Sequence, residues 1–133
     1  MRRMMFHTAI FNDFGRKITS PVPTATSEND ILIQFFLEAL RDDRNSLDNA
    51  IIILDKLLER QVEGLQKDFT WEYIDEFNQV CINFKIGDEL ASLYYCDKDQ
   101  LVLASLLNDS ILQINPKELR VIILEWKEYI DKF

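Results

Sequence analysis

The sequence is poor in the residues on which most catalytic and cofactor-binding motifs depend. Its 133 residues include one histidine, two cysteines and three glycines, which leaves little for a metal cage or a glycine-rich nucleotide loop. His7 lies in a predicted strand without a serine or cysteine near it in sequence, so we expect it to be structural. Together with Cys81 and Cys96 it offers three ligands without the short spacing typical of a zinc site. We therefore expect no catalytic residue, no cofactor and no metal.

The sequence also lacks a long apolar run. The longest one, residues 50–54, suits a core helix, whereas a membrane span needs about 20 residues. The basic start is followed by an apolar stretch that polar residues interrupt, which is not the pattern of a signal peptide. We expect a cytoplasmic protein in which Cys81 and Cys96 are buried free thiols rather than a disulfide.

Positive charge is scarce as well. The chain has 15 Lys and Arg against 23 Asp and Glu, a net charge of −8, so it is poorly suited to holding phosphate backbones. Residues 28–76 contain thirteen acids and five bases, and this uneven distribution predicts an acidic face. A clustered negative surface attracts a cationic partner and speeds its association.

Patterning in the first half predicts one strand followed by two helices. Loose alternation predicts a strand over residues 4–11, and the prolines and glycine of 12–26 predict a long loop. Apolar residues at helical spacing predict helices over 28–42 and 47–63, which Ser27 and Ser46 would cap. Gly64 suits the end of the second helix, and the short connection predicts a helical hairpin.

The sequence pattern of the second half is typical of an antiparallel sheet. Alternation predicts strands near residues 69–74, 80–86 and 90–96, whereas 100–114 fits either strand or helix. Asn115-Pro116 predicts the start of a closing helix. The chain is therefore expected to be a single domain, 1–133, of the α+β class: a curved antiparallel sheet with an N-terminal helical hairpin and a C-terminal helix packed on it.

Pairs of acids fall at the predicted turns, and aromatic residues lie beside one of them. Carboxylates at turns are available to pair with Lys and Arg of a partner, and exposed Trp and Tyr are typical interface anchors. We therefore predict a partner-binding surface made of Asp42, Asp43, Trp71, Tyr73, Asp75, Glu76, Asp88 and Glu89.

The opening strand Met5–Phe11, the acidic helices of the middle third and the amphipathic ending Leu119–Trp126 carry a resemblance over most of the chain. In these features the sequence resembles a bacterial immunity protein of a contact-dependent growth inhibition or other polymorphic toxin system. The resemblance implies an inhibitor that neutralises one cognate toxin in the cytoplasm, commonly a nuclease that cleaves tRNA or DNA. A nuclease must hold phosphates, so an acidic inhibitor can occupy its substrate-binding site.

Two other functions remain open at this point. The chain could be a regulatory or scaffold module that binds a host protein, including a DNA mimic. It could also be a small carboxylate-dependent hydrolase, which requires two acids facing one pocket. The sequence does not define the oligomeric state, although an open sheet edge would allow self-association.

Overall fold

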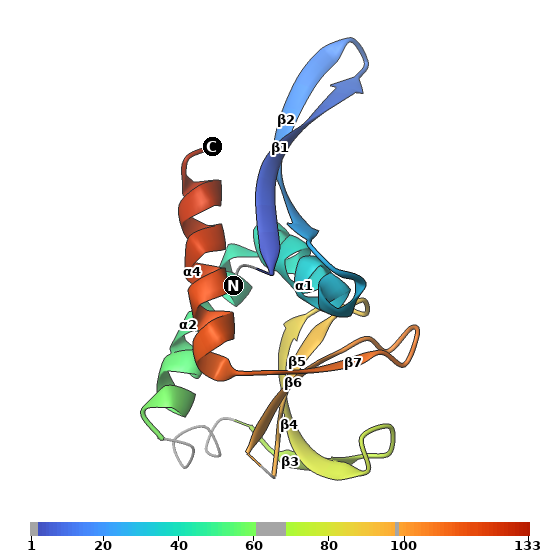
Figure 1. Cartoon of the computed structure of the whole chain (residues 1–133), viewed down its shortest axis with the longest axis vertical. Helices are drawn as coiled ribbons and strands as arrows, with labels where there is room; N and C mark the ends of the chain where they lie inside the picture. The colour runs from blue at the N-terminus through green and yellow to red at the C-terminus, as the bar shows by residue number, and fades with distance from the viewer. Residues whose placement is uncertain (1–2, 61–68, 98) are drawn as a thin grey trace.

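The computed structural model describes residues 3–60, 69–97 and 99–133 (Figure 1). Within them the chain combines a two-stranded and a five-stranded antiparallel sheet with the helices α1, α2 and α4. The predicted α+β class is therefore confirmed. The predicted N-terminal helical hairpin is wrong, because the chain begins with two paired strands and the helices follow them.

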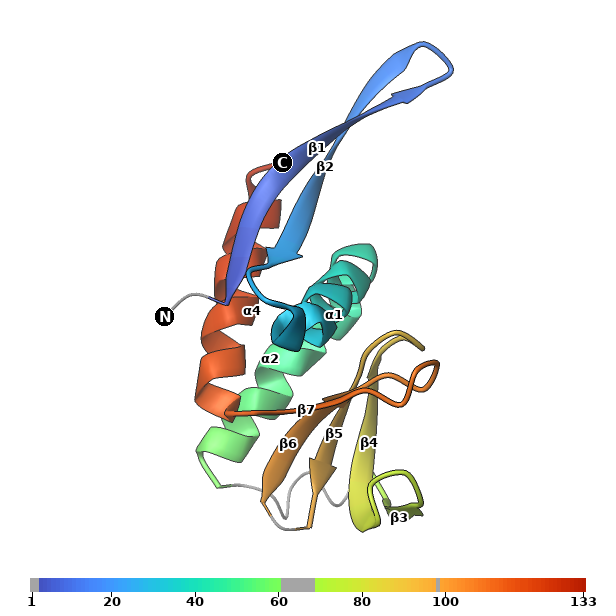
Figure 2. The ribbon, with the colours of Figure 1, turned by 45° about the vertical axis from the view of Figure 1, so that its right-hand side comes forward.

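The first two strands form one long hairpin. β1 (Met4–Asp13) pairs with β2 (Arg16–Ala25) along its whole length. Figure 2 shows the far half of this hairpin projecting beyond the rest of the molecule. The strand predicted over 4–11 is confirmed, whereas most of the loop predicted over 12–26 is strand.

Local chemistry explains why this segment can be a strand despite its glycine and prolines. Phe14 and Gly15 have φ of 48° and 81°, the left-handed conformations that a two-residue hairpin turn needs. Pro21 and Pro23 lie in β2, which is an edge strand of its two-stranded sheet. Proline is tolerated at such an edge because no neighbouring strand needs its missing amide.

A 3₁₀ turn, η1 (Glu28–Asp30), leads into α1 (Ile31–Asp42). Ser27 caps this turn by accepting a hydrogen bond from the Asn29 amide at 3.2 Å, so the predicted start is confirmed. The apolar face of α1 is buried because it packs against both β2 and the larger sheet.

The next helix, α2, spans Arg44–Leu58. Its cap is Asp43, whose carboxylate accepts a hydrogen bond from the Ser46 amide, so the predicted cap at Ser46 is wrong. A carboxylate can cap a helix as a hydroxyl does, so α2 begins at Arg44 instead of at the predicted residue 47. The helix predicted to continue to residue 63 ends at Leu58, and Gly64 lies outside the described residues.

The larger sheet is antiparallel throughout, with strands in sequence order. The run at 100–114 is two strands; the first reads as continuously apolar because it is buried on both faces. The strands are β3 (Trp71–Ile74), β4 (Gln79–Gly87), β5 (Ser92–Cys96), β6 (Gln100–Ala104) and β7 (Ile111–Ile114).

The closing helix, α4 (Pro116–Asp131), begins where predicted, because the Asn115 side chain accepts hydrogen bonds from two amides of its first turn. Trp126 of α4 is fully buried, and its Nε1 donates to the Leu37 carbonyl at 2.9 Å. The described helices lie to one side of the larger sheet, and none of them covers its other face (Figures 1 and 2). In the described part of the chain, no helix is both long and apolar enough to cross a membrane.

Candidate protein-binding surface

The structure separates the predicted site residues instead of joining them in one surface. The β3–β4 and β4–β5 turns lie at opposite ends of β4, because the strands are antiparallel. The β4–β5 turn lies near the end of α1. The acids therefore form two groups: Asp42, Asp43, Asp88 and Glu89 lie near the end of α1 and in the β4–β5 turn, whereas Asp75 and Glu76 lie in the β3–β4 turn, which folds over the sheet so that Glu76 lines a cavity with Ser105 and Leu106.

In the first group, acids of α1 and of the β4–β5 turn lie within electrostatic range of one another. Burial raises the pKa of Glu38, and the negative charges of Asp42 and Asp88 raise it further, against the opposing effect of Arg41. Arg41 also pairs with Asp42, their Nε and Oδ1 atoms being 3.0 Å apart. This end of α1 is therefore acidic but partly neutralised.

The other acids of this group hold local structure together. Asp43 caps α2, and its hydrogen bond with the Ser46 hydroxyl, at 2.9 Å, lowers its pKa. Asp88 accepts hydrogen bonds from two amides in its own turn. The Glu89 carbonyl accepts from the Leu106 amide at 3.2 Å. The carboxylates of Asp43 and Asp88 therefore serve as a cap and within a turn, whereas Glu89 makes its contact through the backbone.

Acids of α2 are also used within the fold. Asp48 pairs with Lys127 at 3.4 Å and Asp55 pairs with Arg120, both bases lying on α4. A third ion pair joins Arg44 to Asp131. The acids of residues 28–76 therefore do not form the single continuous face that their clustering in the sequence predicts.

The two predicted aromatic anchors differ in exposure. Trp71 is half-buried against the core, with its ring centroid 6.1 Å from that of Tyr95. Tyr73 is 58% exposed, and its hydroxyl donates to Asn78 Oδ1 at 2.5 Å. Of these two residues, Tyr73 is therefore the one available to a partner. Side chains alternate along a strand, so Tyr73 and Glu72 lie on opposite faces of β3.

The face of the sheet that carries no helix has a small apolar cluster of its own. Buried Tyr94 and Val102 lie at its centre, and Ile74 and Phe77 pack over them from β3 and its turn. Cys81 and Cys96 face each other across β4 and β5, with Cα atoms 4.1 Å apart, and form a disulfide. The prediction of free thiols is therefore wrong, because the strand register that joins the two residues is not visible in the sequence.

Two adjoining cavities of about 300 and 170 Å³ lie on this face, between the β3–β4 turn and the β6–β7 loop. They share three lining residues, so we treat them as one feature, the outer groove. Its lining residues are Glu76, Phe77, Gln79, Cys96, Gln100, Val102, Ser105, Leu106, Asp109, Ile111 and Gln113.

The outer groove is negative over an apolar floor. Glu76 and Asp109 line the same cavity, and none of the described residues that line the groove is Lys, Arg or His. Burial raises the pKa of the Tyr94 phenol, and the charges of Glu76 and Glu72 raise it further. Gln79 Oε1 is buried there without a hydrogen-bond partner among the described residues. The groove therefore offers acceptors and negative charge to a ligand that donates hydrogen bonds.

Of the residues predicted from the sequence, only Glu76 lines the outer groove. Phe77 and Asp109 were missed because each is a single residue in a turn or loop. One signal was present: Tyr94 and Tyr95 are adjacent aromatics in a strand, which indicates burial on both faces of the sheet. Cys81 lies between the polar residues Gln79 and Asn83 on the same face of β4. This is a second sign that water does not fully cover this face.

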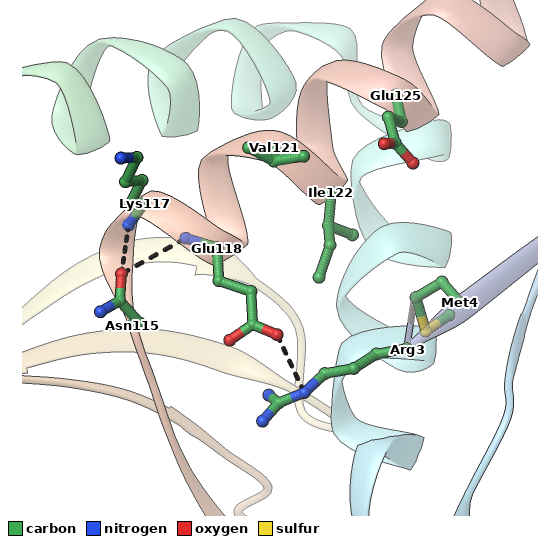
Figure 3. Close-up of a pocket in the computed structure, with 8 residues that line it drawn as sticks. All are labelled: Arg3, Met4, Asn115, Lys117, Glu118, Val121, Ile122 and Glu125. Atoms are coloured by element: carbon green, nitrogen blue, oxygen red, sulfur yellow. Dashed lines mark hydrogen bonds and ion pairs between the residues drawn. The ribbon is translucent and has the colours of Figure 1, made fainter. Parts of the chain in front are cut away.

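A further cavity, of about 510 Å³, lies between the start of β1 and α4 (Figure 3). Arg3 Nε pairs with Glu118 Oε1 at 3.1 Å, and Lys117 and Glu125 also line the cavity. Its acids and bases balance, so it has no preference for a charged partner. Among the described residues no three His, Cys, Asp or Glu side chains converge as metal ligands would.

Comparison of the chain with protein-family models, with curated proteins and with solved structures found no match. The functional inference therefore comes from the charge and shape of the surfaces themselves. Of these, the outer groove combines an apolar floor with unopposed acids in its described lining.

Proposed function

We propose that this chain is a protein-binding module whose outer groove receives a basic side chain of its partner. The observation that carries the proposal is that Glu76 and Asp109 line the same cavity, which has no basic residue in its described lining. An arginine or lysine would place its charged end beside the two carboxylates and lay its aliphatic stem over Leu106 and Ile111.

The unpartnered acceptor in the groove supports the same occupant. A buried carbonyl oxygen without a hydrogen bond costs free energy, so Gln79 gains if its side chain turns Oε1 toward a donor of the ligand. Exposed apolar groups at the edge add area to the contact: Leu106 is 55% and Ile111 50% exposed. Cationic anchors in a partly apolar pocket are typical of protein interfaces.

We propose further that the partner is a basic toxin nuclease and that binding blocks its access to nucleic acid. The excess of eight negative charges in the chain favours association with a cationic protein. A nuclease presents Lys and Arg where it holds phosphates, and these are the groups that the outer groove suits. The resemblance of the sequence to immunity proteins leads to the same partner.

The proposal predicts that a basic nuclease domain is encoded beside the gene for this chain, and the test uses that domain. The full chain should co-elute with that domain and abolish its cleavage of nucleic acid. Substitution of Glu76→Gln together with Asp109→Asn should weaken binding about tenfold to hundredfold, because two acceptors of the basic side chain lose their charge. Binding is measured by calorimetry and cleavage by gel assay.

Glu28→Gln with Glu59→Gln is the matched control, since it removes the same charge from exposed positions elsewhere. The control should bind within a factor of about three of wild type, as expected for long-range electrostatics alone. Equal losses in the two variants would show that net charge, not the outer groove, determines binding. Undiminished cleavage in molar excess of the chain would refute the proposal of inhibition.

Because Glu76 and Asp109 line one cavity, the two substitutions made singly also examine the hydrolase alternative. A carboxylate-dependent enzyme would lose nearly all turnover of chromogenic glycoside or ester probes with either single substitution, since each acid has its own role. If the groove only binds a partner, each single substitution would instead remove part of the affinity for that partner. The absence of turnover of these probes by wild type would count against a hydrolase of these substrate classes.

A further inference from the structure

The far half of the β1–β2 hairpin is exposed on both faces. Every residue from 10 to 19 is exposed, including large apolar side chains: Ile10 at 69%, Phe11 at 53% and Phe14 fully. A two-stranded ribbon with both faces in water is marginally stable by itself. The base of the hairpin is held firmly, with the Phe6 ring packed against Trp126 at a centroid distance of 5.0 Å and a tilt of 50°. The projecting half therefore lacks the packing that its composition requires.

The two edges of the hairpin are not equivalent. On β2, the outward carbonyl of Pro21 accepts a hydrogen bond from Arg41 Nη1 at 3.0 Å, and the Ala25 amide donates to Gln34 Oε1 at 2.8 Å. Arg41 and Gln34 belong to α1, so this helix covers the lower part of the β2 edge. Pro21 and Pro23 also remove two donors from the same edge. β2 is thus protected against pairing with another strand.

The outward backbone of β1 is not capped in this way, although the Thr8 hydroxyl lies 3.2 Å from the Tyr129 hydroxyl of α4. Proline has no amide to donate, so Thr8, which is opposite Pro21, cannot belong to a hydrogen-bonded pair. Its amide and carbonyl therefore point away from β2. Because this direction alternates along the strand, the amides and carbonyls of Ile10 and Asn12 point away from β2 as well. Among the described residues, no side chain or backbone group bonds to these outward atoms. The segment 8–12 also contains no charge and no proline that would discourage pairing.

We propose that the occupant of this edge is β1 of a second copy of the chain, so that two hairpins form one four-stranded antiparallel sheet. A two-fold axis at Ile10 places each Ile10 opposite the other and Thr8 opposite Asn12 of the second copy. In the same register His7 lies opposite Asp13 of the second copy, which pairs complementary groups. The contact is the same patch on both copies and closes as a dimer.

The antiparallel arrangement also sets where the two copies lie relative to each other. In this register Met4 of the second copy lies past Asp13, near the turn of the first hairpin, so the two bodies occupy opposite ends of the sheet. Phe11 would then pack beside Ala9 of the second copy, and part of the exposed apolar surface of both hairpins leaves water. The outer groove lies on the other sheet and remains accessible in the dimer.

The test measures the mass of the full chain by sedimentation over a range from micromolar to millimolar protein. Wild type should be a dimer in reversible equilibrium with monomer. Ile10→Pro removes an outward donor from the β1 edge and should leave a monomer. Thr19→Pro is the matched control, because Thr19 is the cross-strand partner of Ile10 and faces the β2 edge. It should leave the dimer intact.

A second pair of variants guards against disruption of the hairpin by proline. Ile10→Lys places two positive charges at the two-fold axis and should raise the dimer Kd by about tenfold or more, with recovery at about 1 M salt. Thr19→Lys should have little effect. A wild type that stays monomeric at every concentration, or a dimer insensitive to both Ile10 variants, would overturn the proposal. So would equal sensitivity to changes at Thr19.

Discussion

Phe77 packs edge-on against Tyr94, with ring centroids 5.1 Å apart and planes at 85°. Phe77 belongs to the turn between β3 and β4, whereas Tyr94 lies on the helix-free face of β5. The contact therefore fastens the turn across the sheet and sets one wall of the outer groove. Because none of the helices in 3–60, 69–97 and 99–133 covers this face, few other contacts among these residues can replace it.

Substitution of Phe77→Ala should destabilise the fold and widen the outer groove. The expected loss is about 2 kcal/mol in the free energy of unfolding, from a half-buried ring and one aromatic pair. Urea unfolding followed by tryptophan fluorescence measures it. Phe14→Ala is the matched control, because Phe14 is fully exposed at the hairpin turn and its loss should leave the unfolding free energy within about 0.5 kcal/mol of wild type. Equal effects of the two changes would contradict the packing role of Phe77.

The Cys81–Cys96 disulfide should stabilise the sheet. A cross-link between residues 15 positions apart restricts the unfolded chain, which contributes up to about 3 kcal/mol. Reducing agent should therefore lower the urea midpoint of wild type, whereas a Cys81→Ser, Cys96→Ser variant should not respond to it. Protein unfolded without reductant should take up no iodoacetamide, as mass spectrometry can verify. Labelling of both cysteines under these conditions would show that the bond is absent in solution.

Glu38 should make stability depend on pH. Burial, together with Asp42 and Asp88, raises its pKa above the ordinary 4.5, so the folded protein binds this proton more tightly than the unfolded chain. The resulting stability is fully present below pH 4.5 and is lost as the pH rises through the raised pKa. Glu38→Gln stays neutral, so it should be more stable than wild type at neutral pH and similar to it in acid.

Thermal unfolding over this pH range measures the effect. Glu28→Gln is the control, since Glu28 is exposed in η1. It should show the pH dependence of wild type. A Glu38→Gln variant that is less stable than wild type at neutral pH would mean that the Glu38 carboxylate makes favourable contacts that outweigh its burial.

The site was harder to predict than the fold. Six acids were predicted to bind a partner, and the structure uses Asp43 and Asp88 for a cap and a turn. Glu76 lies in the outer groove beside Asp109, a residue 33 positions away whose proximity depends on how the β3–β4 turn folds over the sheet. Trp71 is half-buried against the core because the inner face of β3 packs against Tyr95.

The sequence by itself determined what depends on neighbouring residues. The alternation of 80–86, the start of α4 at Asn115 and the α+β class are confirmed, because periodicity and capping act over a few residues. The tertiary structure alone decided which strands pair and in what register. It made a strand of 16–25, joined Cys81 to Cys96 and shaped the outer groove. These features depend on contacts between residues that are not neighbours in the sequence. The free energy of such contacts cannot be inferred from a local sequence pattern.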